Sequence, residues 1–226
     1  RHTRYGTVTG VQTCALPIWL LPMTVIRREP KGNGRCRTVT LWHSNVTRWG
    51  PQAEGFCAPL PHEILMLCET HLTGDGFAPV RARMGAMGWN AFHSNAVYTG
   101  RSESGTSAGV AIFSRKSHLV SPLDSCVVAE ASAGHDPESL RWVGAVLRLR
   151  GVSVLLVELY LVTGIGMSGE NIEILQQMLS LRGLMNMPMV VAADWQNTPD
   201  ELASTGWLDE CALVPCVPDT PSTCTV

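Results

Sequence analysis

The sequence has no pair of cysteines in the Cys-x-x-Cys spacing that metal-binding fingers use, although it contains eight cysteines in 226 residues. This absence excludes the common zinc-finger arrangements. An even number of cysteines in a chain of this length is weak support for disulfide bonds. We therefore expect scattered reduced thiols, which favours an intracellular protein and leaves its compartment undetermined.

The sequence also has no apolar run of the roughly 18 residues that a membrane-spanning helix needs. The best candidate, residues 152–162, is interrupted by Glu158 and is predicted to be a buried strand. The uncharged stretch 11–26 follows two arginines, as in a signal peptide, but Pro17 and Pro22 would break a helix there. No membrane span is expected.

The chain as a whole has no large excess of positive or negative charge, since its formal net charge is −2. This balance excludes a strong long-range attraction to nucleic acid or to an anionic membrane. The charge is unevenly distributed, since residues 1–50 carry eight Lys or Arg against one acid and residues 51–226 carry nine against 18. The acidic part mildly disfavours tight DNA binding, which requires cationic contacts to phosphates.

The first segment does not fit the rest of the chain. It is basic, it begins with Arg, and residues 6–18 resemble a translated sequencing adapter. We therefore predict that residues 1–36 are a non-native or disordered leader, and we set them aside from the folding argument. Residues 38–226 are predicted to form one domain.

What the sequence does contain is typical of a globular protein. Apolar residues make up 45% of the chain and the mean hydropathy is +0.10, which excludes a wholly disordered chain. Apolar strand-like runs alternate with helical patterns, which favours one α/β domain. Strands are predicted at 38–42, 63–68, 89–98, 110–113, 143–149, 152–160 and 188–194, a hairpin turn at 105–109, and helices at 79–87, between Ser168 and Gly183, and after the Thr198–Glu201 capping box.

Polar residues stand where four of the apolar strands end. They are Asn45, Glu69, Tyr160 and Asp194. Ligands of layered α/β folds bind at strand ends, where loops converge. Two carboxylates and an amide are donors that suit Mg²⁺, which keeps several waters and lets a substrate phosphate complete its coordination. The histidines, among them His43 and His71, show no metal spacing and are expected to be surface, loop or satisfied core residues.

Five short motifs in a fixed order strengthen this interpretation. They are Leu-Trp-His-Ser-Asn-Val at 41–46, Leu-Cys-Glu-Thr-His-Leu at 67–72, the Gly-Thr-Ser-Ala-Gly stretch at 105–115, Leu-Tyr at 159–160, and Val-Val-Ala-Ala-Asp-Trp at 190–195 followed by Thr-Pro. Their order resembles the endonuclease/exonuclease/phosphatase superfamily, the fold of DNase I, over residues 38–210. The resemblance implies an α/β fold, a two-sheet β-sandwich flanked by helices in four layers.

The resemblance also implies roles for individual residues. Glu69 and Asn45 match the family's metal site, with Glu69 binding Mg²⁺ directly and Asn45 organising the metal and the attacking water. Tyr160 matches a tyrosine beside the scissile phosphate, and Asp194 matches the Asp that orients or deprotonates the water. The implied function is a Mg²⁺-dependent phosphoester hydrolase, a nuclease-like phosphodiesterase in which Mn²⁺ could replace Mg²⁺.

Two departures from the family pattern leave an alternative open. Gln196 stands where the family has the Asn of its Asp-x-Asn motif, and its longer stem could misplace the amide. The chain ends at Val226 without the family's Ser-Asp-His, so we expect a C-terminally truncated domain that is inactive in this form. The rival hypothesis is a degenerate domain that only binds a partner. DNA, RNA, and lipid or inositol phosphates all remain open as substrates, and the oligomeric state is undetermined.

Overall fold

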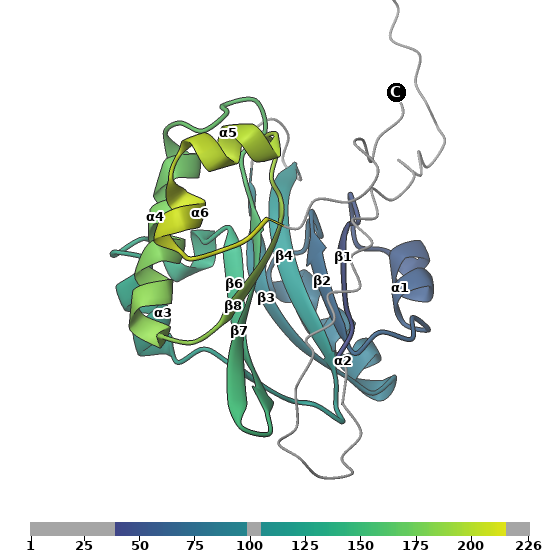
Figure 1. Ribbon diagram of the computed structural model, residues 1–226. Helices are drawn as coiled ribbons and strands as arrows, with labels where there is room; N and C mark the ends of the chain where they lie inside the picture. Colours follow the sequence, from purple (N-terminus) through teal and green to yellow (C-terminus); the bar gives the residue numbers. More distant parts are fainter. Residues whose placement is uncertain (1–38, 99–104, 216–226) are drawn as a thin grey trace, which may run out of the picture.

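Two four-stranded mixed sheets pack face to face, and helices cover the outer face of each sheet (Figure 1). The structure is a computed structural model that describes residues 39–98 and 105–215. Its architecture confirms the predicted two-sheet sandwich flanked by helices. The predicted leader, residues 1–36, lies outside the described residues.

The first sheet has the strand order β1-β2-β4-β3. Its strands are β1 (Leu41–Asn45), β2 (Ile64–Cys68), β3 (Trp89–Tyr98) and β4 (Thr106–Arg115). Strands β1 and β2 run parallel and are connected through α1 (Pro51–Cys57), whereas β3 and β4 pair antiparallel. The antiparallel pairing of β2 with β4 joins these two units.

The second sheet has the order β5-β6-β7-β8. Its strands are β5 (Leu119–Pro122), β6 (Trp142–Leu149), β7 (Val152–Tyr160) and β8 (Met189–Asp194). The predicted hairpin of β6 and β7 is present, with Gly151 at φ +87° in its turn. Strands β7 and β8 run parallel and are connected through α4 (Glu170–Met185). Each sheet therefore ends in a parallel pair with a helical connection, β1 with β2 and β7 with β8.

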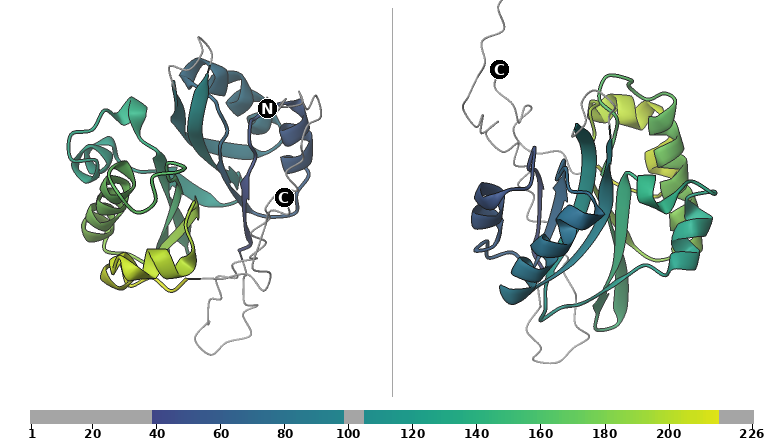
Figure 2. Two further views of the ribbon diagram at one scale, coloured as in Figure 1. Left: turned by 90° about the horizontal axis from the view of Figure 1, so that it is seen from above. Right: turned by 180° about the vertical axis from the view of Figure 1, so that it is seen from behind.

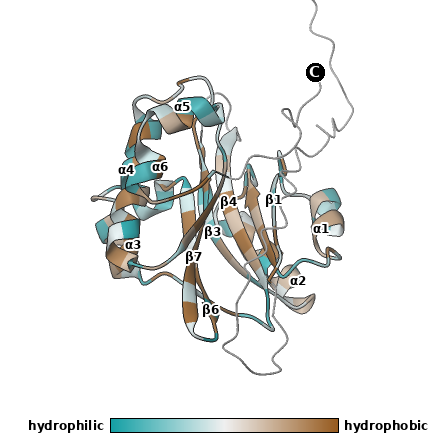
Figure 3. Cartoon of the chain, viewed as in Figure 1, coloured by the Kyte–Doolittle hydropathy of each residue, from teal (hydrophilic) through white to brown (hydrophobic). Residues whose placement is uncertain are grey.

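Apolar side chains form three layers, because alternate residues of a strand point to opposite faces of its sheet. Between the sheets lie residues such as Ile64, Ile112, Leu147 and Leu156. One outer layer packs under α1 and α2 (Gly74–Ala86), and the other under α3 (Ser125–Ala131), α4, α5 (Pro199–Ser204) and α6 (Trp207–Glu210). Figure 2 shows the helices on the two outer sides, and Figure 3 shows the hydrophobic strands between them.

Two predicted helices have different bounds in the structure, and the strand predicted at 38–42 is Leu41–Asn45. Helix α2 begins at Gly74 rather than Pro79, since the buried Phe77 anchors an additional first turn against His93 and the sheet. Helix α4 runs through Gly183 to Met185 and ends at Asn186, which adopts a left-handed conformation with φ +43°. A single Gly costs only about 1 kcal/mol in a helix, and the packing of α4 outweighs that cost.

The stretch 105–109 is not a hairpin turn. Residues from Thr106 onward belong to β4, and the connection from β3 includes residues outside the described part. Gly109 has φ +78° although it lies within the strand. The Gly-rich composition therefore marks a distortion inside β4, whose role is described below.

The helices of the described residues, 39–98 and 105–215, all fall short of the length and apolar character that a bilayer crossing requires. The longest of them is α4, with 16 residues, and its outward side carries polar residues such as Glu173 and Gln176.

The capping box that the sequence predicts for α5 is present. Thr198 Oγ1 accepts a hydrogen bond from the Glu201 N–H, and the Glu201 carboxylate accepts one from the Thr198 N–H at 2.7 Å. Thr198→Ala is expected to lower the free energy of unfolding by about 1 kcal/mol, because it leaves helix donors unpaired. Urea unfolding followed by circular dichroism measures this change. Ser168→Ala is the matched control, since Ser168 does not cap α4; a loss as large as that of Thr198→Ala would contradict the prediction.

Candidate functional site

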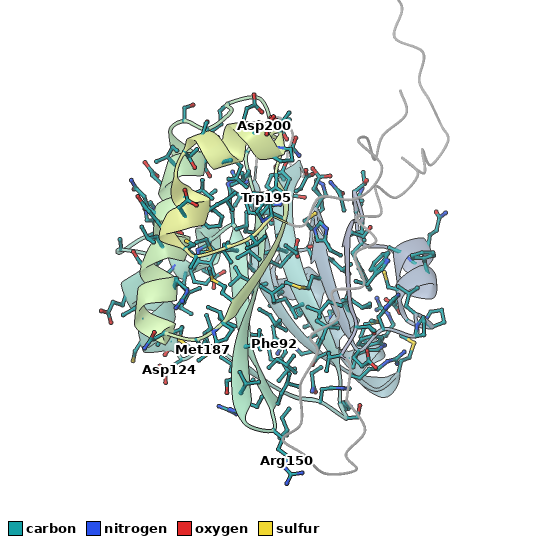
Figure 4. All side chains as sticks on the ribbon, in the orientation of Figure 1. Phe92, Asp124, Arg150, Met187, Trp195 and Asp200 are labelled. Atoms are coloured by element: carbon teal, nitrogen blue, oxygen red, sulfur yellow. The ribbon has the colours of Figure 1, made fainter. Side chains whose placement is uncertain are left out.

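The alternation of side chains brings polar residues together between the sheets at one end of the sandwich. In β1 and β2, Asn45 and Cys68 are register partners, and in β7 and β8 the partners are Tyr160 and Asp194. Each of these residues lies an even number of positions beyond a side chain of the inter-sheet core, so all four face the same interior. Figure 4 places Trp195 and Asp200, just beyond β8, at the end of the sandwich opposite Arg150.

A hydrogen bond links the two sheets at this end. Asn45 Nδ2 donates to Asp194 Oδ2 at 2.8 Å, although the two residues are 149 positions apart in the sequence. Asn45 Oδ1 accepts from the Thr47 N–H, also at 2.8 Å. The Asn45 amide is therefore held at both ends, and it fixes the orientation of the Asp194 carboxylate.

The Asp194 carboxylate is partly buried, and burial raises its pKa above the ordinary value. The hydrogen bond from Asn45 lowers this pKa, while the negative charge of Glu69 raises it. The Gln196 backbone N–H also donates to the carboxylate. The Asp194 carboxylate is thus partly buried, oriented by hydrogen bonds and close to the Glu69 carboxylate.

Glu69 lies just after β2 in a turn that β4 holds in place. Glu69 and His71 both have left-handed backbones, with φ +54° and +55°. The Thr70 N–H donates to the Gly109 carbonyl at 2.9 Å, and the His71 N–H donates to the Ala108 carbonyl at 3.1 Å. A Cβ at Gly109 would lie 2.6 Å from Thr70 Oγ1. The missing side chain at this position therefore lets the turn that carries Glu69 pack against β4.

The Tyr160 hydroxyl lies beside the Glu69 carboxylate. It shares a hydrogen bond with Thr163 Oγ1 at 3.1 Å. Burial raises the pKa of this hydroxyl, and the neighbouring Glu69 raises it further. The loop that follows Tyr160 is held by the buried Asn171 side chain, which bonds to both the N–H and the carbonyl of Val162. Tyr160 therefore presents a protonated hydroxyl from a fixed position.

Gln196 is not brought to the cluster in the same way. It has a left-handed backbone with φ +54°, and its side chain is exposed and makes no hydrogen bond within the described residues. The neighbouring Asn197 amide donates to the Trp195 carbonyl at 2.9 Å and is committed to that turn. Of the five predicted site residues, the structure brings Asn45, Glu69, Tyr160 and Asp194 together and leaves the Gln196 side chain outside.

A second polar cluster, formed by His43, Cys68 and Glu158, lies deeper between the sheets. His43 Nε2 is 3.1 Å from Glu158 Oε1 and 3.8 Å from Cys68 Sγ. Burial raises the pKa of Glu158 to about 7, an increase that the adjacent His43 opposes. The sequence pattern predicts a surface, loop or satisfied core residue at His43 and does not indicate its pairing with Glu158. The available signal was Glu158, an acid inside the apolar run of β7, which could not be satisfied there without a partner.

The two sheets, their outer helices and the polar strand ends form the four-layer α/β sandwich that the resemblance to DNase I predicts. No protein-family model and no curated protein sequence matches the chain.

Solved structures of similar fold include a 3′–5′ exonuclease from Neisseria meningitidis, at 21% identity and a TM-score of 0.46, with 72% of this chain and 64% of that chain covered. The endonuclease domain of TRAS1, a telomere-specific non-LTR retrotransposon, is 14% identical with a TM-score of 0.48, covering 76% and 69%. An AP endonuclease from Leishmania major is 13% identical with a TM-score of 0.49, covering 70% and 60%. This chain therefore spans less than two thirds of the Neisseria and Leishmania proteins.

Proposed function

We propose that this chain carries the site of a Mg²⁺-dependent phosphoester hydrolase, a nuclease-like phosphodiesterase. The observation that supports this most is the hydrogen bond between Asn45 and Asp194 across the two sheets, with the Glu69 carboxylate beside it. An oriented carboxylate next to a second carboxylate is the arrangement that water activation beside a hard cation requires.

The donor set suits Mg²⁺. Glu69 and Asp194 offer carboxylate oxygens, and Mg²⁺ is commonly held by one or two carboxylates with waters and substrate phosphate in its other positions. Glu69 would hold the cation, and Mn²⁺ has the same preference for oxygen ligands. When bound, the cation would offset the negative charge that develops on the phosphate.

The protein's own residues have separate tasks in this proposal. Asp194 orients the attacking water and accepts its proton, and Asn45 keeps the carboxylate in the required orientation. Tyr160 retains its proton, since burial raises its pKa, and donates a hydrogen bond to a phosphate oxygen. A phosphoester is the substrate class, and a nucleic acid is the member that the nuclease-like arrangement favours.

The exposed side chain of Gln196 favours a second candidate. If the amide of this position is needed at the phosphate, the domain would hold the fold and bind a phosphorylated partner without hydrolysing it. Both candidates retain the carboxylates, so turnover distinguishes them. The hydrolase converts substrate, and the binding domain does not.

The test is phosphodiester hydrolysis by a chain extended past Val226, since the 226-residue form is expected to be inactive. Single-stranded DNA, RNA and an aryl phosphodiester are used as separate substrates. We expect turnover with Mg²⁺ or Mn²⁺, loss of turnover in EDTA, and a reduction of about a hundredfold or more in Asp194→Asn. Asp200→Asn is the matched control, since Asp200 is an exposed acid on α5. Binding of these substrates without turnover in any metal would favour the degenerate domain. Turnover that survives both EDTA and Asp194→Asn would contradict the proposal.

A further inference from the structure

Three side chains with different ligand atoms meet between the sheets, below the carboxylates of the proposed hydrolase site. His43 comes from β1, Cys68 from β2 and Glu158 from β7, so both sheets contribute. Cys68 and Glu158 are fully buried, and the His43 side chain is 11% exposed. The three ligand atoms all lie within 4.8 Å of one another.

The separations between these atoms are close to those of a tetrahedral metal site. With Zn–S of about 2.3 Å and Zn–N or Zn–O of about 2.0–2.1 Å, tetrahedral angles place the ligand atoms about 3.3–3.6 Å apart. His43 Nε2 and Glu158 Oε1 are 3.1 Å apart, and His43 Nε2 and Cys68 Sγ are 3.8 Å apart. Two of the three separations therefore lie within a few tenths of an ångström of the tetrahedral values, and the third, between Cys68 Sγ and the Glu158 carboxylate, is within 4.8 Å.

Glu158 has an oxygen that the protein leaves without a partner. Its Oε1 faces His43, but its Oε2 is buried and has no hydrogen-bond partner. Leaving such an atom unsatisfied in the interior is unfavourable, and more so when the group is charged. A cation bound by this carboxylate would remove that cost.

We infer that His43, Cys68 and Glu158 form a second cation site, selective for Zn²⁺ over Mg²⁺. A thiolate and an imidazole are ligands that Zn²⁺ accepts readily, whereas Mg²⁺ prefers oxygen ligands alone. A Cys thiolate and a Glu carboxylate offset the two positive charges, so the buried group would be neutral overall.

The site has a route to solvent. His43 lines a cavity of about 350 Å³, which is bordered by β8, Trp195 and the α5–α6 segment. Three protein ligands with an open fourth position are typical of zinc sites that keep a water. On binding, the Cys68 thiol loses its proton to solvent, and the proton that His43 and Glu158 share is released in the same way. The thiolate, the imidazole nitrogen and the carboxylate oxygen then each form one bond to the metal.

A bound Zn²⁺ would tie β1, β2 and β7 together directly beneath Asn45 and Asp194. Its effect on hydrolysis would be indirect, through the spacing of the two sheets. The inference does not depend on the proposed function, because its measurements are metal stoichiometry and a spectroscopic signal.

Cobalt substitution tests the ligand set directly. The chain is stripped with a chelator and titrated with Co²⁺, which occupies zinc sites and shows a thiolate-to-metal charge-transfer absorption when a Cys binds it. We expect this absorption to saturate at one equivalent and to vanish when one equivalent of Zn²⁺ is added. Absence of the charge-transfer absorption in the unsubstituted chain would overturn the inference.

Variants identify the residue responsible. Cys68→Ala is expected to remove the charge-transfer absorption and to weaken Zn²⁺ binding more than a hundredfold, since even outer partners of metal ligands change affinity 10- to 100-fold. Cys126→Ala, at an exposed cysteine of α3, is the matched control and should bind as the unsubstituted chain does. Glu69→Gln should likewise leave Zn²⁺ binding unchanged. Persistence of the signal in Cys68→Ala would assign it to other cysteines and overturn the site.

Discussion

Replacing Glu69 by Gln is expected to lower Mg²⁺-dependent phosphodiester hydrolysis by about a thousandfold, or roughly 4 kcal/mol of transition-state stabilisation. The substitution keeps the shape of the side chain and removes the charge that would hold the cation. The concentration of Mg²⁺ that gives half of the maximal rate should increase at the same time. Initial rates measured over a range of Mg²⁺ concentrations separate the two effects.

A matched control for this substitution is Glu130→Gln, at an exposed acid of α3 outside the polar cluster. It should leave both the rate and the Mg²⁺ dependence unchanged. Unfolding in urea should give similar midpoints for the two variants, since Glu69 is partly exposed at the end of its strand. A Glu69→Gln variant that keeps most of its activity would show that Glu69 does not hold the catalytic cation.

Gly109→Ala is expected to lower the free energy of unfolding by about 2–4 kcal/mol. A side chain at φ +78° costs about 1 kcal/mol, and overpacking a closed site adds about 1–3 kcal/mol. The new Cβ would lie 2.6 Å from Thr70 Oγ1 and 3.1 Å from the His71 backbone N, in a region where Thr70 is 2% exposed. Displacement of this turn should also move Glu69 and reduce hydrolysis at temperatures where the variant is still folded.

Gly151→Ala separates the cost of a side chain at positive φ from the cost of overpacking. Gly151 has φ +87°, similar to Gly109, but a Cβ there would have no atom within 4 Å. We expect it to cost only the backbone term, about 1 kcal/mol, with full hydrolytic activity. Urea unfolding measures both variants; equal losses would show that close packing around Gly109 contributes nothing.

The positions of the proposed site residues could be predicted from the sequence for a physical reason. Asn45, Glu69, Tyr160 and Asp194 each follow an apolar run, and the ends of strands are where polar side chains reach solvent. The capping box at Thr198 was equally predictable, since it depends on residues three positions apart. Local patterns of this kind survive folding because they involve only neighbouring backbone groups.

The features that the sequence did not predict depend on contacts between distant segments. Gly183 was predicted to stop a helix, but the packing of α4 continues past it. The contact between His43 and Glu158 joins residues 115 positions apart, and it exists only once the sheets face each other. Spacing along the chain could not indicate that pair. The sequence neighbours of His43 indicate only a surface, loop or satisfied core residue, and they carry no information about Glu158.

Each sheet comes from one continuous stretch of chain, residues 41–115 for the first and 119–194 for the second. Asn45 and Glu69 belong to the first stretch, and Tyr160 and Asp194 belong to the second. Neither stretch carries a complete set of functional groups, whatever secondary structure it forms during synthesis. The proposed site is therefore complete only when the two sheets are packed together, so a chain cut between residues 116 and 118 would recover it only by reassociation of the two pieces.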